Sequence, residues 1–232
     1  MFFYPFDSTM VILIPAIILS LYAQLKISST FNRYSQVRSA AGYSGGQTAR
    51  RLLDQNGLYD VQVQPIPGKL TDHYDPRSKV VRLSEEVYYG SSLAALGVAA
   101  HETGHAVQHD HAYAPLAIRT AIVPVANFGS GIAPWLIIIG LFLGQGGGLL
   151  LDIGILAFTA VVIFQLVTLP VEFNASSRAL AFLGNGYLVR DEVRGARRVL
   201  TAAALTYVAA ALTSVLTLVR FLMLAGVGRR DD

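Results

Sequence analysis

TAIVPVANFGSGIAPWLIIIGLFLGQGGGLLL, residues 120–151, contains no charged side chain. A helix needs about 20 apolar residues to cross the roughly 30 Å hydrocarbon layer of a membrane, so this stretch is too long for one crossing. The glycine-rich segment GQGGG at 144–148 interrupts it where a turn can form. The sequence therefore predicts two membrane-spanning helices joined by a short turn.

Other uncharged stretches of comparable length lie between Asp7 and Lys26, between Asp152 and Glu172, and between Arg198 and Arg220. Together these segments predict four spans, at approximately 8–25, 121–143, 150–169 and 200–225. The first of them is preceded by MFFYPFDST, which has no basic residue, and no clear A-x-A cleavage site follows it. We therefore expect an uncleaved anchor.

The composition agrees with a membrane protein. Hydrophobic residues make up 53% of the 232 residues and charged residues only 14%, well below the roughly 25% of a soluble domain. The mean hydropathy is +0.48. The apolar segments are distributed along the whole chain, so we expect one membrane-embedded unit, 1–232.

The chain has no cysteine, so any metal must be bound by His, Asp or Glu. The basic residues flank apolar segments, which argues against nucleic-acid binding.

Basic residues are concentrated in two loops, 26–118 and 171–199, whereas the N-terminal tail and the 144–149 turn have none. Cytoplasmic loops of membrane proteins carry an excess of Lys and Arg. The sequence therefore predicts a multi-pass protein of the inner (cytoplasmic) membrane, with both long loops in the cytoplasm and both termini outside.

The first long loop has the pattern of a small α+β region. Ser44 can cap a helix that continues to about Gln55, and Val61 and Val63 alternate with polar residues as in a half-buried strand. Segments 70–74 and 79–83 flank a turn that contains proline, as in a hairpin. A small-residue helix is expected from Ser91 onward.

His101-Glu102-Thr103-Gly104-His105 lies in that last helix. Residues four positions apart project from the same face of a helix, so His101 and His105 can bind one Zn²⁺. Glu102 is placed to act as the general base on water, as in HExxH zinc peptidases. The same spacing also arises by chance, but the preceding Ala- and Gly-rich turns indicate a closely packed helix. We therefore expect a metal site.

A third ligand is required, and two residues are candidates. His111 completes the His spacing of metzincins, but that motif has glycine where this chain has Gln108, and its downstream Met-turn is missing. Glu172 follows the third span, beside Pro170, which suits a helix start or a kink. We favour Glu172 and interpret His109 and His111 as a solvated helix end.

Three segments make the resemblance to a family specific: LTDHYDPRSKVVRLS at 70–84, AAHETGHAVQ at 99–108, and LPVEFNASSRAL at 169–180 with AAALTYVA at 202–209. From about residue 28 to 220 the chain resembles the YugP-type neutral zinc metallopeptidases of bacteria. It is more distantly similar to HtpX-type membrane gluzincins. The resemblance implies a mainly α membrane protein with four transmembrane helices and a small cytoplasmic α+β zincin-like catalytic region.

The resemblance also implies site residues. His101, His105 and Glu172 would bind one zinc ion, and Glu102 would be the catalytic residue. Ser176 occupies the position where HtpX-type proteins have an aspartate that supports a zinc-bound histidine, so it is a possible contact to the ligands. The strand at 79–83 would be the sheet edge beside the cleft, which would place His73 and Tyr74 near an extended substrate.

Alternatives remain open for several of these residues. His73 and Tyr74 can equally be surface residues of the hairpin. Tyr207 can hydrogen-bond an oxyanion, but packing or interfacial anchoring is the simpler interpretation of its place in the last span.

We expect a zinc endopeptidase that cleaves membrane-associated proteins at the cytoplasmic face. Its partners would then be the lipid bilayer and a protein or peptide substrate. The alternative is a non-enzymatic scaffold or metal carrier with structural zinc. Glu102 favours the enzyme, because a closed structural site requires no carboxylate beside the first histidine.

Overall fold

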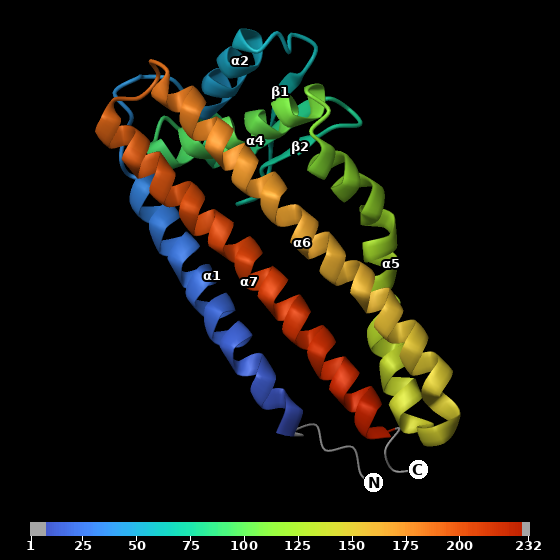
Figure 1. Ribbon diagram of the computed structural model, residues 1–232. Coiled ribbons are helices and arrows are strands. Elements are labelled where there is room, and N and C mark those ends of the chain that lie inside the picture. The colour runs from blue at the N-terminus through green and yellow to red at the C-terminus, as the bar shows by residue number, and fades with distance from the viewer. Residues whose placement is uncertain (1–7, 229–232) are drawn as a thin grey trace. The chain divides into compact units, whose positions relative to one another are not determined.

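A computed structural model describes residues 8–228 (Figure 1). These residues fall into two compact units. We call residues 23–117 and 170–206 the α+β unit, and residues 8–22, 118–169 and 207–228 the helical unit. The element order is η1 Ser8–Leu13, α1 Ile14–Ser35, α2 Gly45–Gln55, β1 Gln62–Ile66, β2 His73–Asp75, β3 Val80–Ser84, α3 Glu85–Tyr89, α4 Leu93–Asp110, α5 Ala114–Phe142, η2 Gly144–Gly147, α6 Gly148–Gly184 and α7 Arg190–Gly228.

Among the described residues, four helical segments are long and apolar enough to cross a membrane. They are Ser8–Ser35, Ala114–Phe142, Gly148–Gly184 and Arg190–Gly226. Each overlaps one of the expected spans, which confirms a mainly helical fold with four candidate spans. Helix α6 continues through Glu172 with Pro170 in its interior, so Pro170 does not start a helix.

Glycines bring α5 and α6 close together within the helical unit. A methyl group at Gly129 would lie 2.5 Å from the Ala157 carbonyl oxygen, and one at Gly140 would lie 2.8 Å from Leu151 Cγ. Small residues at helix contacts are typical of membrane proteins, where close backbone approach replaces the hydrophobic driving force. The connection is the expected turn, in which Gly144 has a φ of 54°, a value that favours glycine.

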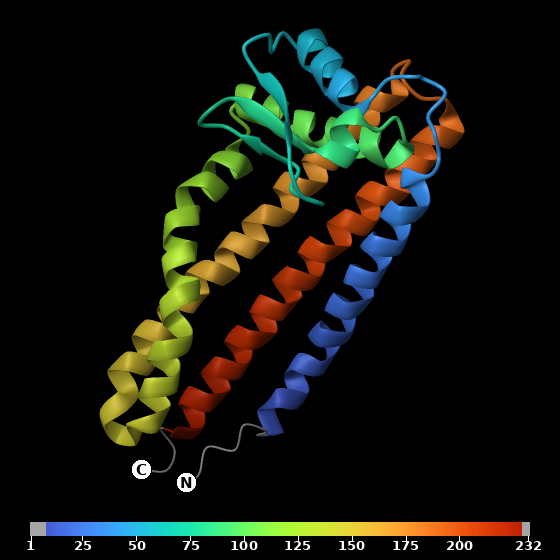
Figure 2. The same cartoon turned by 180° about the vertical axis from the view of Figure 1, so that it is seen from behind.

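The α+β unit begins with the helix expected from Ser44. Ser44 accepts a hydrogen bond from the Gln47 amide, and the Gln47 side chain accepts one from the Ser44 amide, which completes a capping box. Helix α4 also begins at a serine, Ser92, whose side chain accepts a hydrogen bond from the Ala95 amide. Figure 2 shows α2 and α4 close to the small sheet of this unit.

The described strands form one mixed sheet in the order β1-β3-β2. The β2–β3 pair is the expected antiparallel hairpin, whereas β1 pairs with β3 in parallel. The expectation that the 79–83 strand is a sheet edge is therefore wrong, since β3 lies in the middle. The physical reason is burial, because Val80, Val81 and Leu83 are all buried and a strand covered on both faces suits a central position.

The core of the α+β unit forms around α4. Leu52 and Leu53 of α2, Val81 and Leu83 of β3, and Ala99 of α4 belong to one buried cluster. Most residues of α4 are buried, including Glu102, Thr103, His105 and Gln108. This packing fixes the helix that carries the HETGH motif on several sides.

Candidate metal centre

The two histidines of the motif project from the same side of α4, as their spacing predicts. Their ring centroids are 4.7 Å apart, and the ring planes are nearly perpendicular, at 85°. His105 is 9% exposed, and His101 is partly buried. The helix is rich in alanine, which has the highest helix propensity, and so gives the pair a regular backbone.

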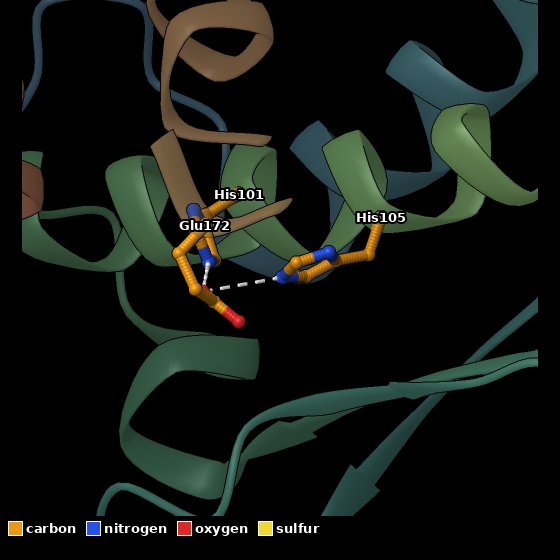
Figure 3. A group of neighbouring side chains, drawn as sticks. All are labelled: His101, His105 and Glu172. Atoms are coloured by element: carbon orange, nitrogen blue, oxygen red, sulfur yellow. Dashed lines mark hydrogen bonds and ion pairs between the residues drawn. The ribbon is translucent and has the colours of Figure 1, made fainter. Parts of the chain in front are cut away.

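Glu172 of α6 reaches both imidazoles (Figure 3). Its Oε2 atom lies 3.2 Å from His101 Nε2 and 3.6 Å from His105 Nε2. Glu172 is only 2% exposed. Within the described residues, His101, His105 and Glu172 form a group whose potential ligand atoms all lie within 4.8 Å of one another.

The spacing of these atoms fits a zinc ion. Tetrahedral ligands at about 2.0–2.1 Å from a zinc ion are separated from one another by about 3.3 Å. The distances of 3.2 Å and 3.6 Å from the carboxylate oxygen to the two imidazole nitrogens are close to that value. Two imidazoles and one carboxylate are also the donor set of many catalytic zinc sites. The residues present therefore fit the metal.

The other nitrogen of each imidazole has its own hydrogen-bond partner. Ser176 Oγ lies 3.1 Å from His101 Nδ1, and Gln108 Oε1 lies 2.9 Å from His105 Nδ1. Histidines that bind metals commonly use the second ring nitrogen in this way. The contact of Ser176 is the one that the sequence suggested. The contact of Gln108 with His105 was not predicted from the sequence. The position of Gln108 about one helical turn after His105 could have indicated it.

Gly104 allows α4 and α6 to approach closely at this point. A Cβ atom at position 104 would lie 2.8 Å from the carbonyl oxygen of Ala175 and 3.3 Å from its Cα atom. These are backbone atoms, which cannot rotate away as a flexible side chain can. The glycine of the motif thus permits the short distance between the histidines on α4 and Glu172 on α6.

Glu102 is 8% exposed and lies on the same helix between the two histidines. Burial raises the pKa of its carboxyl group, although the nearby His101 and His105 act in the opposite direction. Burial acts to lower the pKa of His105, but its hydrogen bond and charge interactions with Glu172 and the charge of Glu102 raise the pKa overall. The protonation of the two carboxylates, Glu102 and Glu172, and of the imidazole of His105 is therefore interdependent.

The remaining residues suggested by the sequence lie outside the three-residue group. His73 Nδ1 is 2.8 Å from the Thr71 carbonyl oxygen, and the Tyr74 hydroxyl is 2.9 Å from His109 Nδ1. His111 is the exposed C-terminal cap of α4. Tyr207 belongs to α7 within the helical unit, so its role remains a prediction.

Known proteins resemble the chain over nearly its full length. The model of a family described as "Putative neutral zinc metallopeptidase" matches residues 9–226. A curated protein of Bacillus subtilis (strain 168), named "Putative membrane protease YugP", is 53% identical over 220 residues, which cover 94% of this chain and 97% of that protein. No solved structure matches the chain significantly. The family match includes the helices that carry the three-residue group.

Proposed function

The chain belongs to the neutral zinc metallopeptidase family, and on this premise we propose that it is a membrane-bound endopeptidase that cleaves membrane-associated proteins at the cytoplasmic face. The family and the zinc metallopeptidase class expected from the sequence are both confirmed by these matches. The observation that carries the proposal is the group of His101, His105 and Glu172 with the buried Glu102 beside it.

His101, His105 and Glu172 would hold a single zinc ion, and three protein ligands are the number typical of catalytic zinc sites. When bound, zinc supplies Lewis acidity that activates water and polarises the scissile carbonyl. Glu102 transfers protons during the reaction. Its carboxylate takes one from the attacking water and delivers it to the nitrogen of the leaving amine as the C–N bond breaks. Burial makes Glu102 a stronger base than an exposed carboxylate, because it raises the pKa.

Structural zinc in a scaffold or carrier is the competing function. Structural zinc sites are usually closed by four protein ligands. Within residues 8–228 the group contains three His, Cys, Asp or Glu residues, and the adjacent buried carboxylate of Glu102 has no role in a closed site. Both features favour catalysis over a structural metal.

Glu102→Gln tests the proposed catalytic residue. The variant keeps the size of the side chain but removes the base, so we expect zinc binding to persist while peptidase activity falls by about 10²–10⁴-fold. Glu85→Gln, at an exposed position of α3, is the matched control and should behave as wild type. Turnover of Glu102→Gln near the wild-type rate, with contaminating peptidases excluded, would refute this role.

Cysteine labelling tests the proposed cytoplasmic position of the α+β unit. The chain has no native cysteine, so a single introduced thiol gives an unambiguous signal. Ser78→Cys should be protected from an impermeant thiol reagent in intact cells, and Gly146→Cys should react. Gly146 has open space around it, whereas a side chain at Gly147 would overlap the Gly140 carbonyl oxygen. Labelling at 78 and protection at 146 would invert the topology.

A further inference from the structure

The side-chain amide of Gln108 has only one possible orientation. Its Nε2 atom lies 2.8 Å from the Val171 carbonyl oxygen, which can only accept a hydrogen bond. The group facing Val171 must therefore be the NH₂ group. The opposite atom, Oε1, can only accept, and it lies 2.9 Å from His105 Nδ1. His105 must then carry a proton on Nδ1, so Nε2, which lies 3.6 Å from Glu172 Oε2, is the ring nitrogen left to bind a metal.

Asn174 and Arg178 reinforce this orientation from α6. Arg178 Nε, which can only donate, lies 2.8 Å from Asn174 Oδ1, and this contact identifies that atom as the oxygen. The same oxygen lies 3.0 Å from Gln108 Nε2. A hydrogen bond from a charged donor is stronger than a neutral one. Each contact from Arg178 to His105 thus has a defined donor and acceptor.

We propose that Gln108, held by Asn174 and Arg178, is a positioning residue that fixes the Nδ1–H tautomer of His105 and so presents Nε2 toward the metal. We call Arg178, Asn174, Gln108 and His105 the amide relay. The inference rests on the proposed function, because it assigns the relay to the zinc site. It extends that proposal to three residues beyond the ligands.

Burial makes the relay difficult to replace. Gln108 is 0% exposed, so water has no access to substitute for a lost contact, and an unpaired buried amide carries a large free-energy cost. The same amide bonds the carbonyl of Val171, the residue directly before Glu172. A single side chain therefore orients one ligand on α4 and anchors the α6 backbone beside another.

His101 provides a contrast within the same site. Its Nδ1 atom contacts the hydroxyl of Ser176, and a hydroxyl can either donate or accept. That contact is compatible with both neutral tautomers of His101. The amide relay therefore acts on only one of the two imidazoles, which makes its effect separable by mutation.

Gln108→Met is the principal test, because methionine has a similar length but removes the amide. Zinc affinity is measured by competition with a chelator on the full chain in detergent. We expect affinity to fall by about 10–100-fold, the usual effect of losing a contact to a metal-binding histidine. Ser177→Ala, which removes an exposed hydroxyl that donates to the Phe173 carbonyl oxygen, is the control and should leave affinity unchanged.

Variants of α6 test the same relay if Gln108→Met fails to fold. Asn174→Asp keeps an oxygen for both donors and should bind zinc nearly as wild type, whereas Asn174→Leu should lose about tenfold or more in affinity. Arg178→Met should weaken binding in the same direction. Equal zinc affinity in Asn174→Leu, Arg178→Met and wild type would overturn the proposal.

Nuclear magnetic resonance of ¹⁵N-labelled histidine separates positioning from general stability. In the zinc-loaded wild type, the His105 Nδ1 proton should exchange slowly, since it is bonded to a buried oxygen. In a folded Gln108→Met variant that signal should exchange rapidly. In the zinc-loaded wild type, an unprotonated Nδ1 of His105 would overturn the proposal. Wild-type protein that fails to bind zinc would instead refute the proposed function, so the two failures are distinguishable.

Discussion

Gly104→Ala should impair the metal site although it adds only one methyl group. The added Cβ would lie 2.8 Å from the Ala175 carbonyl oxygen, whereas ordinary contacts begin at 3.4 Å. Relief of the overlap requires α4 and α6 to separate by about 0.6 Å at this point. Metal–ligand distances in protein sites lie within about 0.2 Å of their preferred values. The separation therefore moves the two histidines away from Glu172 by more than the site can absorb.

We expect zinc affinity and peptidase activity of Gly104→Ala to fall by about tenfold or more, since a displacement of about 1 Å can cost 10²-fold in rate. Overpacking costs about 1–3 kcal/mol of folding free energy. The higher helix propensity of alanine offsets about 1 kcal/mol of that. The net loss of folding free energy is therefore about 0–2 kcal/mol, comparable with the ~1.4 kcal/mol that corresponds to a tenfold loss of affinity. The two effects are separated on the purified variant by zinc titration and thermal unfolding.

Gly97→Ala is the matched control on the same helix. A Cβ atom at position 97 would lie 3.6 Å from Ala196 Cβ, an ordinary contact. This variant should keep full zinc affinity and gain about 0.5–1 kcal/mol in stability. Wild-type zinc affinity and activity in Gly104→Ala would show that the close approach of α4 and α6 does not determine the site geometry.

Two further outcomes follow from local contacts. Ser44→Ala removes the capping box of α2 and should lower the free energy of unfolding by about 1 kcal/mol, as measured by thermal unfolding, without changing zinc affinity. The pKa of His105 in the zinc-free protein is raised above 6.5, and zinc binds the neutral imidazole. Zinc affinity should therefore be full above the raised pKa of His105 and decline as the pH falls through that pKa. Calorimetric titration with zinc at several pH values measures this. A zinc affinity that stays constant with pH would contradict the prediction.

Local signals allowed much of the fold to be predicted. The uncharged lengths indicated the apolar helices, Ser44 indicated the start of α2, and the proline turn indicated the β2–β3 hairpin. Each of these features depends on residues close together in sequence. The spacing of His101 and His105 likewise fixed their common face, because helix geometry alone determines it.

The features that were not predicted depend on contacts between residues far apart in the sequence. The order of the strands depends on β1 joining β3 in parallel, a contact that hairpin patterns do not encode. The buried residues Val80, Val81 and Leu83 were the available sign that β3 is central. In the sequence, Gln108 was noted only because the metzincin motif has glycine at that position. Its contact with His105 was not predicted, since its other partners, Val171 and Asn174, lie on a helix distant in sequence. No sequence pattern indicated that Gly104 contacts Ala175.

Zinc stoichiometry of Glu172→Ala and His111→Ala tests the central assignment most directly. Glu172 lies 3.2 Å from one imidazole nitrogen and 3.6 Å from the other, whereas His111 is an exposed helix cap. Loss of a ligand should lower zinc affinity by more than the roughly 10–100-fold that follows from losing a contact to a ligand. We predict that purified Glu172→Ala is metal-depleted and inactive while His111→Ala retains one zinc ion per chain and its activity. A zinc-loaded Glu172→Ala together with a metal-free His111→Ala would contradict the account.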